Sequence, residues 1–258
     1  MPAFGPIRRR DLIAALRGDL TETVRRHGGR GLVGVLSPML ACEEAYLLAK
    51  YLKSLAPDVR LALGRVPVVG SDDAYPKTRG GPSGTPKFVI HAEKCPNRRG
   101  IEDLLMSFER SIMSFDLVLS EINAGSVKAV FLTGGYPGPW LTAAEIETLT
   151  KPELVVLVDI LSSAATENAD YVLPGAAWAE KDGSYVNCEG LLQTTERAVR
   201  SPGHARAEGR IFWELAGRPR MYHAGDVLRE LAAEVPYFAD CAEGEVPEHG
   251  VRLAWGEL

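Results

Sequence analysis

Short apolar runs alternate along this chain with segments that have the apolar spacing of helices. The apolar runs lie at residues 31–38, 59–64, 127–135, 154–160 and 169–177, and the helical spacing lies at residues 43–55, 101–124, 142–149 and 162–168. Continuous apolar runs are typical of strands buried on both faces, and their alternation with helices is typical of a parallel sheet. We therefore predict an α/β fold, a doubly wound and mostly parallel sheet with helices on both faces.

Three segments make up the predicted organisation of the chain. An N-terminal helical segment covers residues 1–30, an α/β domain covers 31–177, and residues 178–258 pack on that same domain. The last segment is predicted to contain a β-hairpin (184–187 with 191–195), two helices (205–218 and 224–235) and an irregular tail from Pro236. The spacing over residues 11–27 fits one helix or two short helices that meet near Gly18.

A long stretch rich in glycine and proline, residues 65–99, interrupts the α/β pattern. Loops of this length are uncommon inside compact domains and are often functional, although a meandering surface insertion fits the sequence equally well. One piece of it, residues 87–92, has the composition of a short strand.

Composition excludes several classes of protein. The chain has 258 residues, of which 46% are hydrophobic and 24% charged, and its net charge is −5. A dedicated nucleic-acid-binding protein is usually basic, so we expect no nucleic-acid partner. No run reaches the roughly 18 apolar residues of a membrane-spanning helix, and no apolar stretch follows the N-terminal arginines as in a signal peptide. We expect a cytoplasmic protein without a membrane span.

No metal site is predicted from the cysteines. Cys42, Cys95, Cys188 and Cys241 are separated from one another by tens of residues, and the histidines are scattered in the same way. Iron–sulfur and zinc sites normally include at least one close cysteine pair. Buried or inert thiols are the better interpretation of these residues.

A glycine-rich turn offers a candidate binding site. Gly134 and Gly135 follow a predicted strand and precede a predicted helix. Such a turn can hold a phosphate against backbone N–H groups, but a plain tight connection explains it as well. Acidic residues also lie near strand ends or turns, at Asp159, Asp170, Asp182 and Glu189. Turn and capping roles explain these better than acid–base catalysis, so we predict no catalytic residue.

Longer motifs resemble one protein family. Residues 154–193 resemble the C-terminal region of molybdopterin oxidoreductase large subunits; their sequence is LVVLVDILSSAATENADYVLPGAAWAEKDGSYVNCEGLLQ. The typical form of that region in the family is a strand ending in Asp, a TETA-like segment, ADVVLP and A-x-x-x-E-K-D-G-T-x-x-N-x-E-G-R. Residues 36–52 resemble the family's S-P-x-x-T-N-E-E-x-Y-L-x-x-K segment, and 209–218 resemble the helix that follows the hairpin. CPNRRGIE (95–102) is similar to a piece of the large iron–sulfur (G) subunit of NADH–quinone oxidoreductase.

The resemblance implies a fold and a candidate cofactor site. In the family, cluster-binding segments and the molybdenum ligand lie upstream of the matched part, so this chain would correspond to the C-terminal α/β region, as half of a split subunit or a gene fragment. A molybdopterin guanine dinucleotide would then lie at the strand ends. The candidate cofactor-binding residues, working or vestigial, are Gly134, Gly135, Asp159, Asp182, Asn187 and Glu189.

Four departures from the family motifs argue against a working cofactor site. The family's T-N-E-E is Ala41-Cys42-Glu43-Glu44 here, and its G-x-N-P turn has Tyr136 in place of Asn. The second Thr of T-E-T-A is Ala165, and the Arg of E-G-R is Leu191. A buried dinucleotide would lose hydrogen bonds at about 1–3 kcal/mol each. We therefore expect no cofactor in this chain.

Three hypotheses follow. The first is a non-catalytic α/β component of a molybdopterin-oxidoreductase-like or NADH–quinone oxidoreductase G-like subunit. It would be a structural partner, at the inner face of the membrane, of a protein carrying the N-terminal iron–sulfur part and of other respiratory-complex subunits. The second is an oxidoreductase subunit that still binds the guanine dinucleotide. The third is an unrelated nucleotide-binding domain, such as the middle domain of a thiamine-diphosphate enzyme, and the long ordered motif argues against it.

Two structural expectations accompany the first hypothesis. The partner would contact Tyr136, Pro137, Pro139, Trp140 and Trp178, unless these aromatic residues fold into their own core. Asn187 and Glu189 would bond backbone groups of neighbouring loops, so that Glu189→Ala would lower the melting temperature.

Overall fold

A five-stranded parallel sheet forms the centre of the protein, whose computed structural model describes residues 8–254 except 79–80 and 83–84. The strands are β1 (Leu32–Leu36), β2 (Arg60–Leu63), β7 (Ala129–Thr133), β8 (Leu154–Asp159) and β9 (Tyr171–Pro174), in the order β2-β1-β7-β8-β9. All four neighbouring pairs are parallel, and every residue of β1, β7 and β8 is buried. The predicted α/β sheet is confirmed.

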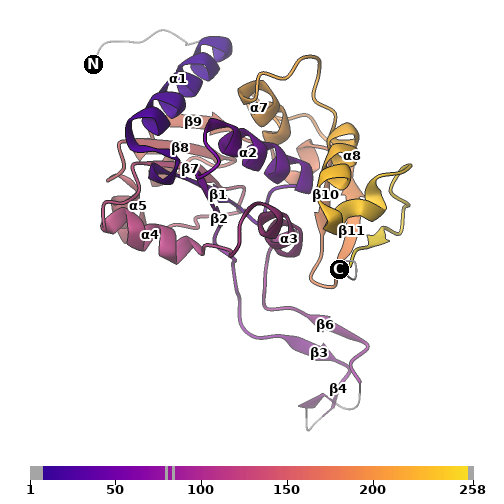
Figure 1. Ribbon diagram of the computed structural model, residues 1–258. Coiled ribbons are helices and arrows are strands. Elements are labelled where there is room, and N and C mark those ends of the chain that lie inside the picture. The colour runs from indigo at the N-terminus through magenta and orange to yellow at the C-terminus, as the bar shows by residue number, and fades with distance from the viewer. Residues whose placement is uncertain (1–7, 79–80, 83–84, 255–258) are drawn as a thin grey trace.

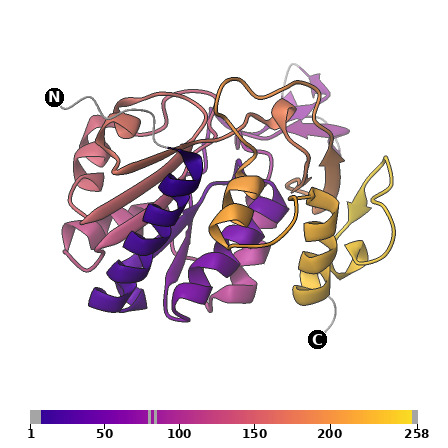
Figure 2. The same ribbon diagram turned by 90° about the horizontal axis from the view of Figure 1, so that it is seen from above.

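Helices cover both faces of this sheet (Figure 1). One face packs against α1 (Arg9–His27), α2 (Cys42–Leu55), α3 (Arg98–Phe108), α7 (Glu208–Leu215) and α8 (Ala224–Glu234), the other against α4 (Phe115–Asn123), α5 (Ala143–Leu149) and α6 (Ala164–Asn168). In Figure 2, α1, α7 and α8 lie in a row on the first face. Side chains of β1 alternate between the two cores, Leu32 and Leu36 in one and Val33 and Val35 in the other. The sheet is therefore doubly wound, as predicted.

The sheet order reverses direction between β1 and β7. From β1 the chain crosses to β2 on one side, and it later returns to β7 on the other side. The connections that leave β1 and β7 therefore diverge, which opens a crevice at the carboxyl ends of the strands.

A second, antiparallel sheet lies beside the first. β10 (Gly183–Val186) pairs with β11 (Leu191–Thr195), which confirms the predicted hairpin, and β12 (Val251–Arg252) adds a third strand. A 3₁₀ helix, η3 (Pro236–Cys241), precedes β12, and two others are η1 (Gly29–Gly31) and η2 (Trp178–Glu180). The tail predicted to be irregular contains two short elements, η3 and β12, and η3 buries Tyr237 and Phe238 in the main core.

The structure decides two further element predictions. Residues 11–27 belong to a single helix, α1. The predicted helix over residues 101–124 is instead two helices, because the chain between them bonds to the edge of the sheet. Glu109 accepts a hydrogen bond from the Leu61 N–H, and Met113 bridges to Ala62. Ser114 then caps α4 by accepting from the Leu117 N–H.

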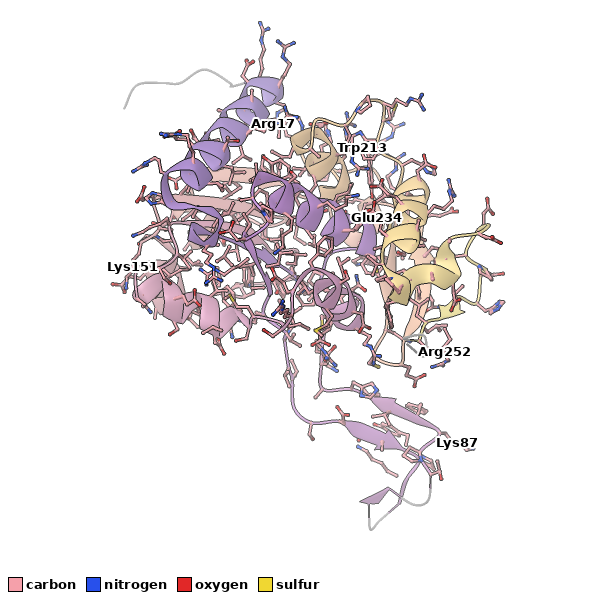
Figure 3. All side chains as sticks on the ribbon, viewed as in Figure 1. Arg17, Lys87, Lys151, Trp213, Glu234 and Arg252 are labelled. Atoms are coloured by element: carbon pink, nitrogen blue, oxygen red, sulfur yellow. The ribbon has the colours of Figure 1, made fainter. Side chains whose placement is uncertain are left out.

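The glycine- and proline-rich stretch forms a β-arm, defined here as residues 68–93. β3 (Asp73–Tyr75) pairs with β6 (Phe88–Ile90), and β4 (Lys77–Thr78) pairs with β5 (Gly81–Pro82). Figures 1 and 3 show the arm projecting away from the body, with Lys87 far from the helices. The predicted strand within residues 87–92 is confirmed as β6.

One buried core extends from α1 to Leu253. It includes residues from the N-terminal helix, the parallel sheet and the 178–254 region, so these parts share their packing. Within the described residues, no helix combines the length and the apolar character needed to cross a membrane.

Candidate functional site

A cleft of about 640 Å³ lies at the carboxyl ends of the parallel strands. Segments that follow β1, β7, β8 and β9 form one wall, β10 and β11 form another, and the base of the β-arm closes the rim. Its lining residues are Met39, Lys94, Pro96, Gly135, Pro137, Ile160, Ala176, Ala177, Trp178, Lys181, Tyr185, Asn187, Gln193 and Thr195. Ligands of open α/β sheets bind at this position, so the cleft is the candidate site.

Asp159 fixes the glycine turn that borders this cleft. Its Oδ1 accepts hydrogen bonds from the N–H groups of Gly135 (2.9 Å) and Ile160 (2.8 Å), and its Oδ2 accepts from Trp140 Nε1 at 3.0 Å. A Cβ on Gly134 would lie 2.4 Å from the Asp159 carboxyl carbon, and Gly135 has a φ of 90°. The turn therefore requires both glycines, and its N–H groups are bonded within the protein.

The remaining candidate cofactor-binding residues lie in two places, one in the cleft and the other outside it. Asn187 lines the cleft, and its Oδ1 accepts from the N–H groups of Glu189 (2.9 Å) and Leu191 (3.0 Å), so it shapes its own hairpin turn. Asp182 and Glu189 are exposed and do not line the cleft. Asp182 accepts from the Arg197 N–H, and the Glu189 side chain lies 3.5 Å from Arg252. As cofactor ligands, all six candidates remain predictions.

Glu189→Ala should change the free energy of unfolding by less than about 0.5 kcal/mol, because exposed ion pairs contribute little. Asn187→Ala should cost about 1 kcal/mol, since two turn N–H groups lose their acceptor. Urea denaturation of both variants measures the difference. A loss of more than about 1 kcal/mol in Glu189→Ala would instead indicate that the Glu189 side chain bonds backbone groups of neighbouring loops.

A buried ionic cluster that the sequence did not reveal supports the cleft wall. Lys181 Nζ lies 2.8 Å from Glu44 Oε2 and 2.7 Å from Glu208 Oε2, and all three side chains are at most 4% exposed. Glu44 also accepts from the Ala41 N–H at the start of α2 and from the Gly209 N–H in α7. The cluster therefore joins α2, α7 and the segment before β10. The sequence signal that could have indicated this buried cluster is the presence of charged residues within otherwise apolar motifs.

Burial controls the ionisation of this cluster. It would lower the pKa of Lys181, but Glu208 and Glu44 outweigh that effect and keep the pKa well above its ordinary value. Burial raises the pKa of Glu208 although Lys181 opposes the change. Glu43, next to the cluster, accepts a hydrogen bond from the Ser184 N–H at 2.9 Å, and burial raises its pKa to about 7.

Stability should fall as the pH rises, because the pKa of Glu43 is higher in the folded protein than its ordinary value of 4.5. The folded state holds this proton more tightly, so the contribution is complete below about pH 4.5 and is lost by about pH 7 and above. We expect a loss of about 3 kcal/mol from this group. Glu43→Gln, which keeps an acceptor for Ser184, should flatten the decline when melting temperatures are measured from pH 4.5 to 8.5, whereas Glu248→Gln on the surface should not. An unchanged slope in Glu43→Gln would contradict the assignment.

Side chains at several motif departures lie away from the cleft. Ala41 and Cys42 are fully buried, and Cys42 contacts Asn97. Tyr136 is also buried and donates to the Arg65 carbonyl at 2.6 Å. The Ala41 and Cys42 side chains both pack within the core.

The expected partner surface is also only partly exposed. Tyr136 and Trp140 stack on each other at 4.6 Å, and Trp140 packs against the core formed with α4. Tyr136 and Trp140 therefore pack within the core of this protein, which is the alternative to a contact with a partner. Pro137, Pro139 and Trp178 remain exposed, and Trp178 is 70% exposed at the cleft rim.

The cleft suits an apolar or aromatic group better than a pyrophosphate. Its cations are Lys94, which donates to the His91 carbonyl, and Lys181, which is neutralised by two carboxylates. The Tyr185 hydroxyl is buried and has no hydrogen-bond partner among the described residues. A bound group could therefore accept one hydrogen bond there, while most of the lining offers apolar contact. Among the described residues, no cluster of three or more His, Cys, Asp or Glu side chains could hold a metal ion.

Comparison with known proteins gives one family. Residues 108–218 match the family model for molybdopterin oxidoreductase. F420-dependent formate dehydrogenase 1 subunit alpha of Methanococcus maripaludis is 34% identical over 123 residues, which cover 44% of this chain and 18% of the relative. NADPH-Fe(3+) oxidoreductase subunit alpha of Geobacter sulfurreducens is 34% identical over 128 residues, which cover 47% of this chain and 15% of the relative. Putative formate dehydrogenase YrhE of Bacillus subtilis is 31% identical over 147 residues, which cover 55% of this chain and 15% of the relative. The matches span less than a fifth of each relative.

Proposed function

Because residues 108–218 belong to the molybdopterin oxidoreductase family, as their motifs predicted, we propose that this chain is the α/β component of a multi-subunit oxidoreductase. In this role it supports the assembly structurally and carries no electrons itself. Two of the relatives are named as alpha subunits, which supports a role beside other subunits.

The observation that carries this proposal is the chemistry of the cleft. The matched region supplies the cleft residues that follow β7, β8 and β9 together with those of β10 and β11. Most of these side chains are apolar, and Asp159 occupies the Gly135 N–H that a phosphate would need. Such a surface favours contact with an apolar protein segment over recognition of a dianionic pyrophosphate.

The partner in this proposal is a protein carrying the iron–sulfur part of the subunit. The finer assignment, to a NADH–quinone oxidoreductase G-like subunit, depends on the CPNRRGIE motif at residues 95–102. Under that assignment the complex would include other respiratory subunits and would lie in the cytoplasm, at the inner face of the membrane.

A second candidate function is an oxidoreductase subunit that binds a molybdopterin guanine dinucleotide in the cleft. The unpartnered Tyr185 hydroxyl favours it, since a buried hydroxyl without a partner costs about 1–3 kcal/mol that a bound group could recover. Chemical analysis of protein purified from its native source separates the two functions. Iron, molybdenum and pterin well below one equivalent support the structural role. Near-stoichiometric molybdenum and pterin, reduced in Tyr185→Phe, would establish the second function.

Trp178→Ser should weaken co-purification of the iron–sulfur partner by about tenfold or more, because buried tryptophans contribute strongly to protein interfaces. Met221→Ser is the matched control, since Met221 is 84% exposed and does not line the cleft. Affinity purification with quantitative mass spectrometry measures partner recovery for both variants. Equal recovery from the two variants would rule out an interface at the cleft rim.

A further inference from the structure

A second hollow, of about 460 Å³, shares only Lys181 with the cleft. It is formed by the segment after β11, by α7 and by the connection from α7 to α8. Five arginines line it: Arg197, Arg200, Arg206, Arg210 and Arg220. We call it the arginine hollow. The concentration of positive charge is notable because the whole chain has a net charge of −5.

Three of these arginines have no anionic partner in the described part of the chain. The guanidinium groups of Arg197, Arg200 and Arg220 take part in none of its side-chain hydrogen bonds or ion pairs, and all three residues are exposed. Arg220 also has a φ of 67°, a left-handed conformation that is uncommon outside glycine. Uncompensated arginines around a concave surface produce a strongly positive potential.

The acidic residues of the hollow are already bonded within the protein. Glu214 binds Arg9 and Arg210, and Asp182 accepts from the Arg197 N–H. Glu180 accepts from the Ala177 N–H in its own turn. These carboxylates therefore leave the three unpaired arginines available for an external anion.

Two aromatic side chains, Tyr222 and Trp213, also line the hollow. The Tyr222 hydroxyl is buried and has no hydrogen-bond partner among the described residues. It lies against the first turn of α7, since a Cβ on Gly209 would be 2.4 Å from it. That turn already holds carboxylates, since Glu208 is its first residue and Glu44 accepts from the Gly209 N–H. Trp213, labelled in Figure 3, adds an aromatic side chain to the lining.

From this arrangement we propose that the arginine hollow binds a small organic phosphate of nucleotide size that carries at least two phosphate groups. Guanidinium forks match phosphate oxygens in a bidentate manner. The volume admits a mononucleotide, whose base could contact Trp213 while its phosphates meet the arginines. The site is independent of the structural role proposed for the cleft.

Calorimetric titration of the full chain with pyrophosphate and with ATP tests this proposal, with citrate as a carboxylate of similar charge. We expect saturable binding of both phosphates and weak or no binding of citrate. Arg197→Glu/Arg200→Glu should weaken phosphate binding at least about tenfold, since two charge-assisted contacts are lost. Arg30→Glu/Arg110→Glu makes the same charge change at exposed residues outside the hollow and should leave binding unchanged.

Melting temperatures and a further ligand complete the test. Unchanged melting temperatures in the arginine variants would exclude misfolding. The proposal is overturned if neither phosphate binds, if both double variants lose binding equally, or if citrate or an oligoglutamate peptide binds as tightly as ATP. The last result would identify an acidic protein segment as the natural occupant.

Discussion

Lys181→Met should lower the free energy of unfolding by about 3–5 kcal/mol, because it leaves two buried carboxylates without their cation. Glu44 and Glu208 are nearly inaccessible to solvent, so water cannot replace the lost ammonium group. The loss should be larger at pH 8 than at pH 5, since burial raises the pKa of Glu208 and its protonation at lower pH removes part of the unpaired charge. The expected result is a large, pH-dependent fall in the urea midpoint.

Lys50→Met is the matched control for this experiment. Lys50 also contacts two carboxylates, Glu230 and Glu234, but all three side chains are partly exposed. Its loss should cost less than about 1 kcal/mol. The triple variant Lys181→Met/Glu44→Gln/Glu208→Gln should recover part of the stability by removing the unpaired charges. Equal effects in the two lysine variants would show that Lys181 is not a structural cation.

Asn97→Ala should destabilise the protein by about 2–5 kcal/mol, since it leaves two buried backbone groups without partners. Asn97 is fully buried, and its Nδ2 donates to the Leu40 carbonyl at 2.8 Å. Its Oδ1 accepts from the Val186 N–H at 2.7 Å. One amide, at the start of α3, therefore joins the segment before α2 to the end of β10.

Chemical denaturation of Asn97→Ala and Asn97→Asp measures this effect. Asn97→Asp keeps an acceptor for Val186 but loses the donor to Leu40, so we expect a measurable loss of stability in this variant too. Asn123→Ala is the control because Asn123 is exposed at the end of α4 and should change stability by less than about 0.5 kcal/mol. A stability of Asn97→Ala close to that of the control would contradict this role.

Local signals were enough to predict most elements of the parallel sheet and its helices. The five apolar runs became its five strands, and the three central strands, β1, β7 and β8, are buried along their whole length. Thr142 and Glu145 form the capping box expected from their spacing, and both reciprocal hydrogen bonds are present. The hairpin at residues 183–195 also followed from its turn residues.

Elements that depend on distant contacts could not be predicted in this way. The break between α3 and α4 is set by Glu109, which bonds the backbone of β2 some 48 residues earlier in the chain. β12 has two residues and exists only through its pairing with β11. Neither feature has a periodic pattern, because each is determined by a partner far away in sequence.

The candidate site was predictable in position but not in the roles of its residues. The glycine turn and the hairpin do border the cleft, as a doubly wound sheet requires. The sequence does not show that Asp159 faces the turn or that Asp182 faces solvent. Asp159 ends an apolar run and Asp182 follows two charged residues, and neither pattern fixes the direction of the side chain. Nor does it show that Glu44, Lys181 and Glu208 meet, since three separate motifs must fold before their charges come together.

The long sequence separation within this buried cluster has a consequence for synthesis on the ribosome. Glu44 is 137 residues from Lys181, and β1 receives its second neighbour only when Ala129–Thr133 have been made. A growing chain therefore carries an open strand edge and unpaired carboxylates through much of translation. Such a nascent chain is prone to pair with the wrong edges, so its yield should depend on chaperones that shield the first half until the second half emerges.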